Sequence, residues 1–266
     1  MNTHSIRYRG QLLRAKQQGY FARTSWAKLL SLLPKPTETW PAKDFAEVVA
    51  RDSATGLVEY MCSLGKFWAG PDDREALADT AIEILSGVYE YGDVAIRPGD
   101  IVFDMGCNLG TFTRVALDRG AARVISFEPQ PFYQQCIRKT FAEEIAAGRV
   151  TVVEQPLWSE KKTVHFAGAS LVGHIADEGI PMQTITLDEV VESLGLPRVD
   201  FLKADIEGAE RHALMGAGNT IRRDRPRVAF CVYHYPDDPE VIGNILRGFV
   251  DYKMVFDSSG RYVYCW

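Results

Sequence analysis

Acidic, amide and glycine residues are concentrated in the stretch DMGCNLG, residues 104–110, directly after the apolar run IVF. Glycines let a backbone approach a bound ligand closely, and the N-terminus of a following helix favours an anionic group. The stretch therefore predicts a ligand-binding loop between a strand and a helix. In such a loop, the carboxylate of Asp104 suits an ammonium group and Asn108 suits a carboxylate.

A second acid, Glu128, stands eighteen residues past Gly110 in the segment FEP, which ends at Pro129. An acid at the end of the strand after a glycine loop is placed to accept hydrogen bonds from ribose hydroxyls. The loop lacks the G-x-G-x-x-G spacing that NAD binding favours. S-adenosylmethionine carries a ribose, an ammonium group and a carboxylate, so it is the cofactor that these residues predict, with Glu128 and Pro129 in its site.

Candidate catalytic residues follow two later strands. The segment DFLKADIEGAE, residues 200–210, ends an apolar strand with Asp205 and Glu207, which we interpret as site residues. Lys203 shares a strand face with Asp205 and is expected to pair with a carboxylate. His234 ends the strand VAFCVYH and is the candidate general base, because a neutral imidazole with a pKa near 6.5 accepts a proton at physiological pH.

Short apolar strands and helices alternate from residue 98 onward. Continuously apolar strands that alternate with helices predict a parallel sheet covered on both faces. A capping box formed by Thr186 and Glu189 predicts the start of one of these helices. The expected strands are IVFD, RVISFEP, RVTVVEQPLW, VDFLKAD and RVAFCVYH, with an antiparallel pair KMVFDSS and RYVYCW at the end and short edge strands KTVHFAG and MQTITL.

The first ninety or so residues have a different pattern. Residues 21–33 and 72–91 carry apolar side chains at helical spacing, and three prolines lie between residues 34 and 41. We expect a mainly helical arm over residues 1–92, which frames the substrate, and a cofactor-binding domain over residues 93–266. The N-terminal helices are also the candidate interface for a homo-oligomer.

Composition excludes several classes of protein. The 266 residues are 46% hydrophobic with a net charge of −5, and no apolar run is long enough for a membrane span. An apolar signal core is absent at the N-terminus, and the five scattered cysteines form no CxxC pair, so we expect a reduced protein of the cytoplasm. Residues 1–37 carry seven basic side chains and no acid, whereas the remainder has a balance of −12, which disfavours nucleic acid as a partner.

Four segments together resemble the FkbM family of S-adenosylmethionine-dependent methyltransferases. They are PGDIVFDMGCNLGTFT, FEPQP, TLDEVV and DFLKADIEGAE, within roughly residues 97–235. The resemblance implies an α/β fold with the Rossmann-like seven-stranded sheet of class I methyltransferases, and methylation of a hydroxyl on a sugar or a secondary metabolite. It further implies a ribose ligand, Glu128, and an acidic pair near the transferred methyl, Asp205 and Glu207. The cofactor loop that the resemblance implies consists of Asp104, Gly106, Asn108, Gly110 and Thr111.

Alternatives remain open at this point. They are an NAD-dependent oxidoreductase, a nucleic-acid methyltransferase and a methyltransferase-like binding protein without activity. For the methyltransferase, Mg²⁺ held by Asp205, Glu207 and His234 is the alternative to a general base. The acceptor is expected to be a small molecule or a glycan, and the sequence does not identify it.

Overall fold

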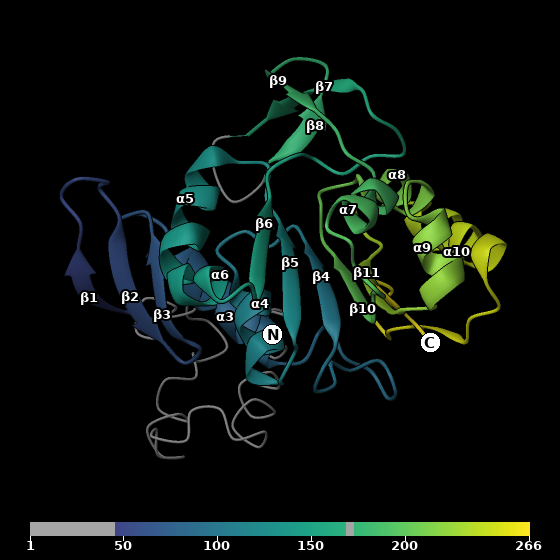
Figure 1. Ribbon diagram of the computed structural model, residues 1–266, viewed down its shortest axis with the longest axis horizontal. Coiled ribbons are helices and arrows are strands. Elements are labelled where there is room, and N and C mark those ends of the chain that lie inside the picture. Colours follow the sequence, from purple (N-terminus) through teal and green to yellow (C-terminus); the bar gives the residue numbers. More distant parts are fainter. Residues whose placement is uncertain (1–45, 169–172) are drawn as a thin grey trace, which may run out of the picture.

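The computed structural model describes residues 46–168 and 173–266. Within these residues the central sheet has seven strands in the order β12-β13-β11-β10-β4-β5-β6. Neighbouring strands from β11 to β6 pair in parallel, and β13 runs antiparallel to both β11 and β12. The predicted α/β fold with a seven-stranded, Rossmann-like sheet is therefore confirmed (Figure 1). The strands are β4 (Ile101–Met105), β5 (Arg123–Phe127), β6 (Val150–Val153), β10 (Phe201–Ala204), β11 (Arg227–Cys231), β12 (Met254–Phe256) and β13 (Tyr262–Cys265).

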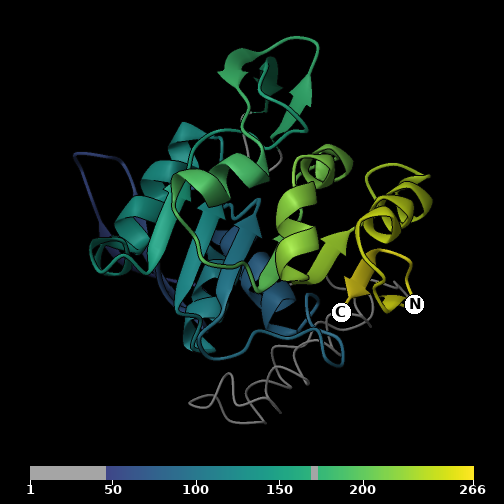
Figure 2. The same ribbon diagram turned by 45° about the vertical axis from the view of Figure 1, so that its right-hand side comes forward.

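Helices cover both faces of this sheet, because its strands are apolar on both sides. Val102 of β4 lies in one buried cluster, whereas Ile101 and Phe103 lie in the other. The two sets of helices flank the sheet in Figure 2. The first set is α3 (Arg74–Leu85), α4 (Thr111–Asp118) and α5 (Pro131–Thr140), with the short α6 (Ala142–Ala146) after it; the second is α7 (Leu187–Ser193), α8 (Glu210–Met215), α9 (Gly218–Asp224) and α10 (Asp238–Phe249).

The N-terminal region differs from its prediction. Its described part forms an antiparallel sheet of three strands, β1 (Glu47–Arg51), β2 (Val58–Cys62) and β3 (Gly65–Ala69), followed by α3. The expectation of a mainly helical region is therefore wrong for residues 47–69. The helix predicted at 21–33 and the basic arm lie outside the described residues, and the domain boundary at residue 92 stays a prediction.

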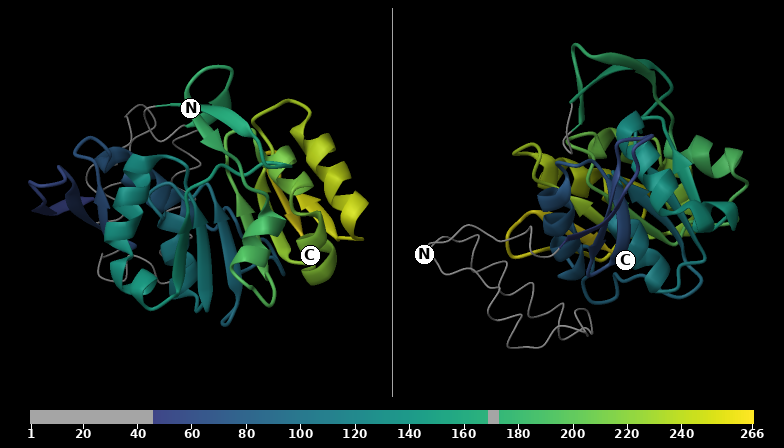
Figure 3. Two further views of the ribbon diagram at one scale, coloured as in Figure 1. Left: turned by 45° about the horizontal axis from the view of Figure 1, so that its top comes forward. Right: turned by 90° about the vertical axis from the view of Figure 1, so that its left-hand side faces the viewer.

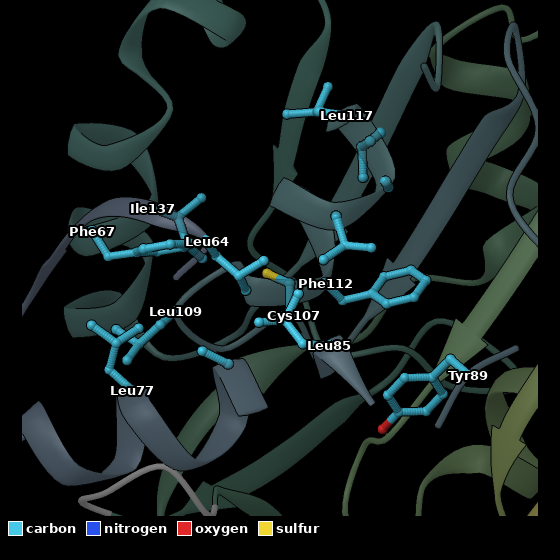
Figure 4. Packing of buried hydrophobic residues seen from close by; sticks show 14 of the residues in the cluster. Leu64, Phe67, Leu77, Leu85, Tyr89, Cys107, Leu109, Phe112, Leu117 and Ile137 are labelled. Carbon is cyan, nitrogen blue, oxygen red and sulfur yellow. The ribbon is translucent and has the colours of Figure 1, made fainter. Parts of the chain in front are cut away.

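The N-terminal strands and α3 pack onto the cofactor-loop side of the sheet. Leu77 and Leu85 of α3 meet Leu109 and Phe112 in one buried cluster with Phe67 of β3 (Figure 4). The left panel of Figure 3 shows β1–β3 beside this half of the molecule. Segments that precede the glycine loop in sequence thus help to hold it in place.

A second antiparallel sheet stands beyond one end of the central sheet, at the top of Figures 1 and 2. Among the described residues it has three strands in the order β8-β7-β9, which are β7 (Thr163–Ala167), β8 (His174–Ala176) and β9 (Ile180–Gln183). The prediction of short added strands is confirmed here. The predicted capping box of Thr186 and Glu189 is also present at the start of α7.

Candidate active site

A cavity of about 240 Å³ lies at the carboxyl ends of β4, β5, β6 and β10. Its wall includes Asn108 and Thr111 from the glycine loop, Glu128 and Pro129 after β5, and Asp205 after β10. Side chains from α3 and from the β7–β8 sheet complete it. The structure thus brings most of the predicted cofactor residues and both predicted acids to one cavity, because the strands that precede them are neighbours in the sheet. Three predicted residues do not line it: Asp104, Gly110 and His234.

The glycine loop is compatible with little else than glycine at two positions. Gly106 has φ +75°, and a Cβ there would lie 1.9 Å from the carbonyl oxygen of Asp205. Gly110 has φ +83°, and its Cβ would lie 2.4 Å from the ring of Phe141. The first glycine therefore lets β4 and β10 meet at the cavity, and the second lets α4 begin close against α5.

Replacing Gly106 with Ala tests this close approach. Gly56, in the turn before β2, has nearly the same φ of +74°, but nothing lies within 4 Å of its Cβ position. Gly56→Ala therefore measures backbone strain alone, and Gly106→Ala adds steric overlap, which typically costs about 1–3 kcal/mol. We expect Gly106→Ala to lower the free energy of unfolding in urea by this further amount. Equal losses in the two variants would contradict the account of the loop.

Asp104 does not line the cavity, contrary to its predicted contact with an ammonium group. Its side chain is fully buried, with Oδ1 3.1 Å from Nζ of Lys203 and Oδ2 accepting a hydrogen bond from Thr113 at 2.7 Å. Lys203 and Asp104 are direct partners in the β10–β4 register, which places the two charges together. Asp104 therefore holds Lys203 beneath the loop, and the prediction that Lys203 pairs with a carboxylate is confirmed.

Lys203 joins this ion pair to the glycine loop. Its ammonium group donates hydrogen bonds to the carbonyl oxygens of Met105 and Gly106, at 3.2 and 2.7 Å. Burial alone would lower the pKa of Lys203, but attraction to Asp104 and Asp205 outweighs burial and raises it. The lysine is therefore charged, and it fixes the backbone at the start of the loop.

Glu128 is buried at the end of β5 and faces the cavity. Its two carboxyl oxygens accept hydrogen bonds from the backbone N–H groups of Asn108 and Gln130, at 3.1 and 2.9 Å. Burial raises the pKa of Glu128 to about 7, although these two hydrogen bonds act in the opposite direction. The group therefore changes charge near neutral pH, and it links the glycine loop to the segment after β5.

Three acids surround His234. Its Nε2 lies 3.5 Å from Asp205 Oδ1 and 3.4 Å from Glu207 Oε2, and its Nδ1 lies 3.2 Å from Glu210 Oε1. Burial alone would lower the pKa of His234, but the contacts with Glu207, Glu210 and Asp205 raise it to about 10. The expectation of a neutral His234 at physiological pH is therefore wrong, since the side chain is there the positively charged imidazolium, with a proton on both ring nitrogens. We did not predict Glu210 from the sequence, although it ends the segment that drew attention to Asp205.

Glu210 fixes the turn that presents the other two acids. Its carboxylate is fully buried and accepts hydrogen bonds from the backbone N–H groups of Ile206 and Gly208, at 2.7 and 3.0 Å. Glu207 sits in this turn with φ +55°, which is uncommon and costly for a residue other than glycine. The buried acid thus stabilises a strained turn that carries Glu207.

Asp205 is held from the other side by two tyrosines that no sequence pattern identifies. Tyr89 donates a hydrogen bond to Asp205 Oδ2 at 3.0 Å, and the hydroxyl of Tyr233 lies 3.3 Å from Oδ1. Tyr89 lines the cavity from the segment after α3, and Figure 4 shows it beside Phe112. The N-terminal region therefore supplies part of the site.

Comparison with known proteins identifies the family of the chain. The Methyltransferase FkbM domain matches residues 104–252 of the chain. The chain belongs to the FkbM methyltransferase family. The match begins at the glycine loop and ends after α10, so β1–β3, α3 and Tyr89 lie outside it.

Relatives of this FkbM-family chain include two curated methyltransferases. The 31-O-demethyl-FK506 methyltransferase FkbM of Streptomyces tacrolimicus is 26% identical over 199 residues, which are 60% of this chain and 75% of the relative. The hexuronic acid methyltransferase AglP of Haloferax volcanii is 30% identical over 128 residues, which are 46% of this chain and 52% of AglP. The chain thus matches about half the length of AglP.

A solved structure is also similar. The crystal structure of methyltransferase FkbM from Methylobacillus flagellatus has a TM-score of 0.49 and 18% sequence identity, and the match covers 74% of this chain and 56% of that chain. Within the described residues, no helix combines the length and the apolar character that crossing a bilayer demands.

Proposed function

We propose that this FkbM-family methyltransferase uses S-adenosylmethionine to methylate a hydroxyl group of a sugar or a secondary metabolite. The main observation in favour of this cofactor is the charge of the cavity. Among its described lining residues are four acids, Glu83, Glu128, Asp205 and Glu207, and Lys203 is the only lysine or arginine. Because Asp104 already opposes the charge of Lys203, the cavity favours a cation over a pyrophosphate.

The residues present fit each part of this cofactor. The buried carboxylate of Glu128 would accept hydrogen bonds from the ribose hydroxyls, and Asn108 in the glycine loop and Thr111 at the start of α4 would hold the amino-acid part. Pro129 and Leu157, which follow β5 and β6, offer apolar contact to the adenine ring. Bound S-adenosylmethionine supplies a methyl group activated by a positively charged sulfur.

Glu207 is the group that we assign to proton removal. Asp205 already accepts hydrogen bonds from Tyr89 and Tyr233, and the protonated His234 cannot act as the base at neutral pH. Glu207 lines the cavity, and 32% of its side chain is exposed. As the acceptor oxygen bonds to the methyl carbon and the bond from that carbon to sulfur breaks, the hydroxyl proton passes to the Glu207 carboxylate. His234 is then a positioning residue that neutralises part of the acidic cluster.

Mg²⁺ is a second candidate for activating the hydroxyl. Asp205, Glu210 and His234 each offer an atom within 4.8 Å of the others. Binding of an ion there requires the imidazole of His234 to give up its proton. Full turnover in EDTA supports the general-base mechanism, and loss of turnover that Mg²⁺ restores supports the metal.

Titration calorimetry with S-adenosylhomocysteine tests the cofactor. We expect S-adenosylhomocysteine to bind and NAD not to bind. Glu128→Gln should weaken the binding free energy by about 1.5–3 kcal/mol, because the variant loses a charged acceptor for the ribose hydroxyls. Glu160→Gln, an exposed acid outside the cavity, serves as the control and should leave the affinity unchanged. NAD binding without any response to S-adenosylhomocysteine would refute the proposal.

The pH dependence of this binding gives a second readout. Since the pKa of Glu128 is about 7, its carboxylate becomes protonated as the pH falls below that value. The affinity for S-adenosylhomocysteine should therefore decrease from pH 8 to pH 6 in the parent protein. This step should be absent in Glu128→Gln, and its persistence there would assign it to another group.

A further inference from the structure

A second cavity, of about 170 Å³, lies beside the first. Its wall is formed by Trp158, His212, Arg211 and Tyr235, together with residues of the turn after β10. Three residues, Ile175, Glu207 and Ala209, line both cavities. The two spaces therefore meet at Glu207, and Glu207 is the only acid among the described residues that line both.

We propose that the second cavity binds the acceptor as a single hydroxylated ring, an inference that rests on the proposed function. Methyl transfer needs donor and acceptor aligned at one point, and a base must reach the acceptor hydroxyl there. The shared wall at Glu207 satisfies both conditions. A ligand in the main cavity and a ligand in the second cavity therefore approach each other at the wall that Glu207 shares.

The volume and the lining residues of the second cavity indicate which class of compound can bind there. Its volume is smaller than the 240 Å³ of the main cavity, so it suits a ligand smaller than the adenosyl cofactor. Trp158 and His212 both line the cavity, and their rings stack on each other with 3.7 Å between the centroids. The ring of Tyr235 packs against the turn after β10, because a Cβ at Gly208 would lie 2.7 Å from it.

Polar side chains line the second cavity as well as aromatic ones. Arg211 lies over the Tyr235 ring at 4.8 Å and pairs with Asp237 and Asp238, which hold it in place. A purely apolar acceptor would desolvate Glu207 without giving it a hydrogen bond, at a cost in binding energy. A ring with apolar faces and hydroxyl groups at its edge matches a cavity that is lined by both aromatic side chains and a carboxylate. Tyr235, which is 49% exposed, is placed at the mouth.

Saturation-transfer NMR on the full chain, saturated with S-adenosylhomocysteine, tests this proposal. The probes are methyl β-D-glucopyranoside, methyl β-D-galactopyranoside, methyl α-D-mannopyranoside and sodium glucuronate, with acyclic sorbitol as the control compound. We expect at least one ring compound to bind and sorbitol not to bind. Tyr235→Ala and Trp158→Ala should each weaken the ring compound roughly 2–12-fold and leave the affinity for S-adenosylhomocysteine unchanged.

Tyr91→Ala is the matched control, because Tyr91 is 47% exposed and lies outside both cavities. It should leave binding of the ring compound unchanged. The inference is overturned if no ring compound binds, if sorbitol binds equally well, or if both cavity variants retain full affinity. Since the affinity for S-adenosylhomocysteine is measured separately on the same proteins, failure of this compound to bind the parent protein would count against the proposed function instead.

Discussion

Replacing Glu207 with Gln is expected to lower kcat by about 10²–10⁴-fold, the usual contribution of a general base. The amide keeps the shape of the side chain, but it cannot accept the hydroxyl proton. The affinity for S-adenosylhomocysteine should change little, since that compound carries no charge on sulfur and the ribose contact is proposed for Glu128 rather than for Glu207. Calorimetry and initial rates under conditions where methyl transfer limits turnover separate the two effects.

Glu192→Gln provides the matched control for Glu207, because Glu192 is an exposed acid on α7. It should keep the parent rate. A Glu207→Gln enzyme within threefold of the parent would exclude Glu207 as the base.

The pH profile distinguishes Glu207 from His234. If a neutral His234 were the base, kcat would rise with pH through about 6.5, the ordinary pKa of a histidine. Because its pKa is about 10, His234 remains protonated across this range, and we expect no such rise at saturating cofactor.

The raised pKa of His234 also has a consequence for the stability of the fold. The contribution of His234 to stability is fully present below its unfolded pKa and is lost as the pH rises through about 10.

Lys203→Met is expected to reduce the free energy of unfolding by about 3–5 kcal/mol. The substitution leaves Asp104 charged, fully buried and without its ion-pair partner. It also removes the hydrogen bonds to the carbonyl oxygens of Met105 and Gly106. Urea unfolding measured by circular dichroism reports the loss, and cofactor affinity should fall with it because the glycine loop loses its anchor.

A double variant shows whether the ion pair is the cause. Combining Lys203→Met with Asp104→Asn removes the buried charge that the single variant leaves uncompensated. The double variant should therefore be more stable than Lys203→Met alone. A single variant that loses less than about 1 kcal/mol, or a double variant that is no more stable, would mean that the pair contributes little.

The sequence predicts the sheet well, because alternating apolar strands and helices leave few arrangements. The sequence pattern does not show which strands lie side by side in the sheet. Asp104 lies near the end of β4, where a contact with the ligand is expected, but the register places it opposite Lys203 on β10. The N-terminal strands were missed for a similar reason. Each is five residues long, and their pairing in residues 47–69 depends on neighbours rather than on a long periodic signal.

In the site, too, local sequence patterns identify some residues, whereas the roles of others depend on contacts that only the fold creates. Glu128, Asp205 and Glu207 could be selected because acids at strand ends are unusual, and the structure places them around one cavity. The charge state of His234 depends on three carboxylates that only the folded turn brings within 3.5 Å. Tyr89 reaches Asp205 across 116 positions of sequence, which no local pattern reveals.

Methyl transfer from trideuteromethyl-labelled S-adenosylmethionine tests the central claim most directly. The purified chain is incubated with the labelled cofactor and with the ring compounds that bind it, and the products are analysed by mass spectrometry. The account predicts a trideuteromethyl ether on one hydroxyl of the acceptor and an equal amount of S-adenosylhomocysteine, both nearly absent with Glu207→Gln. Label on nitrogen or carbon of the acceptor, or undiminished product from Glu207→Gln, would contradict it.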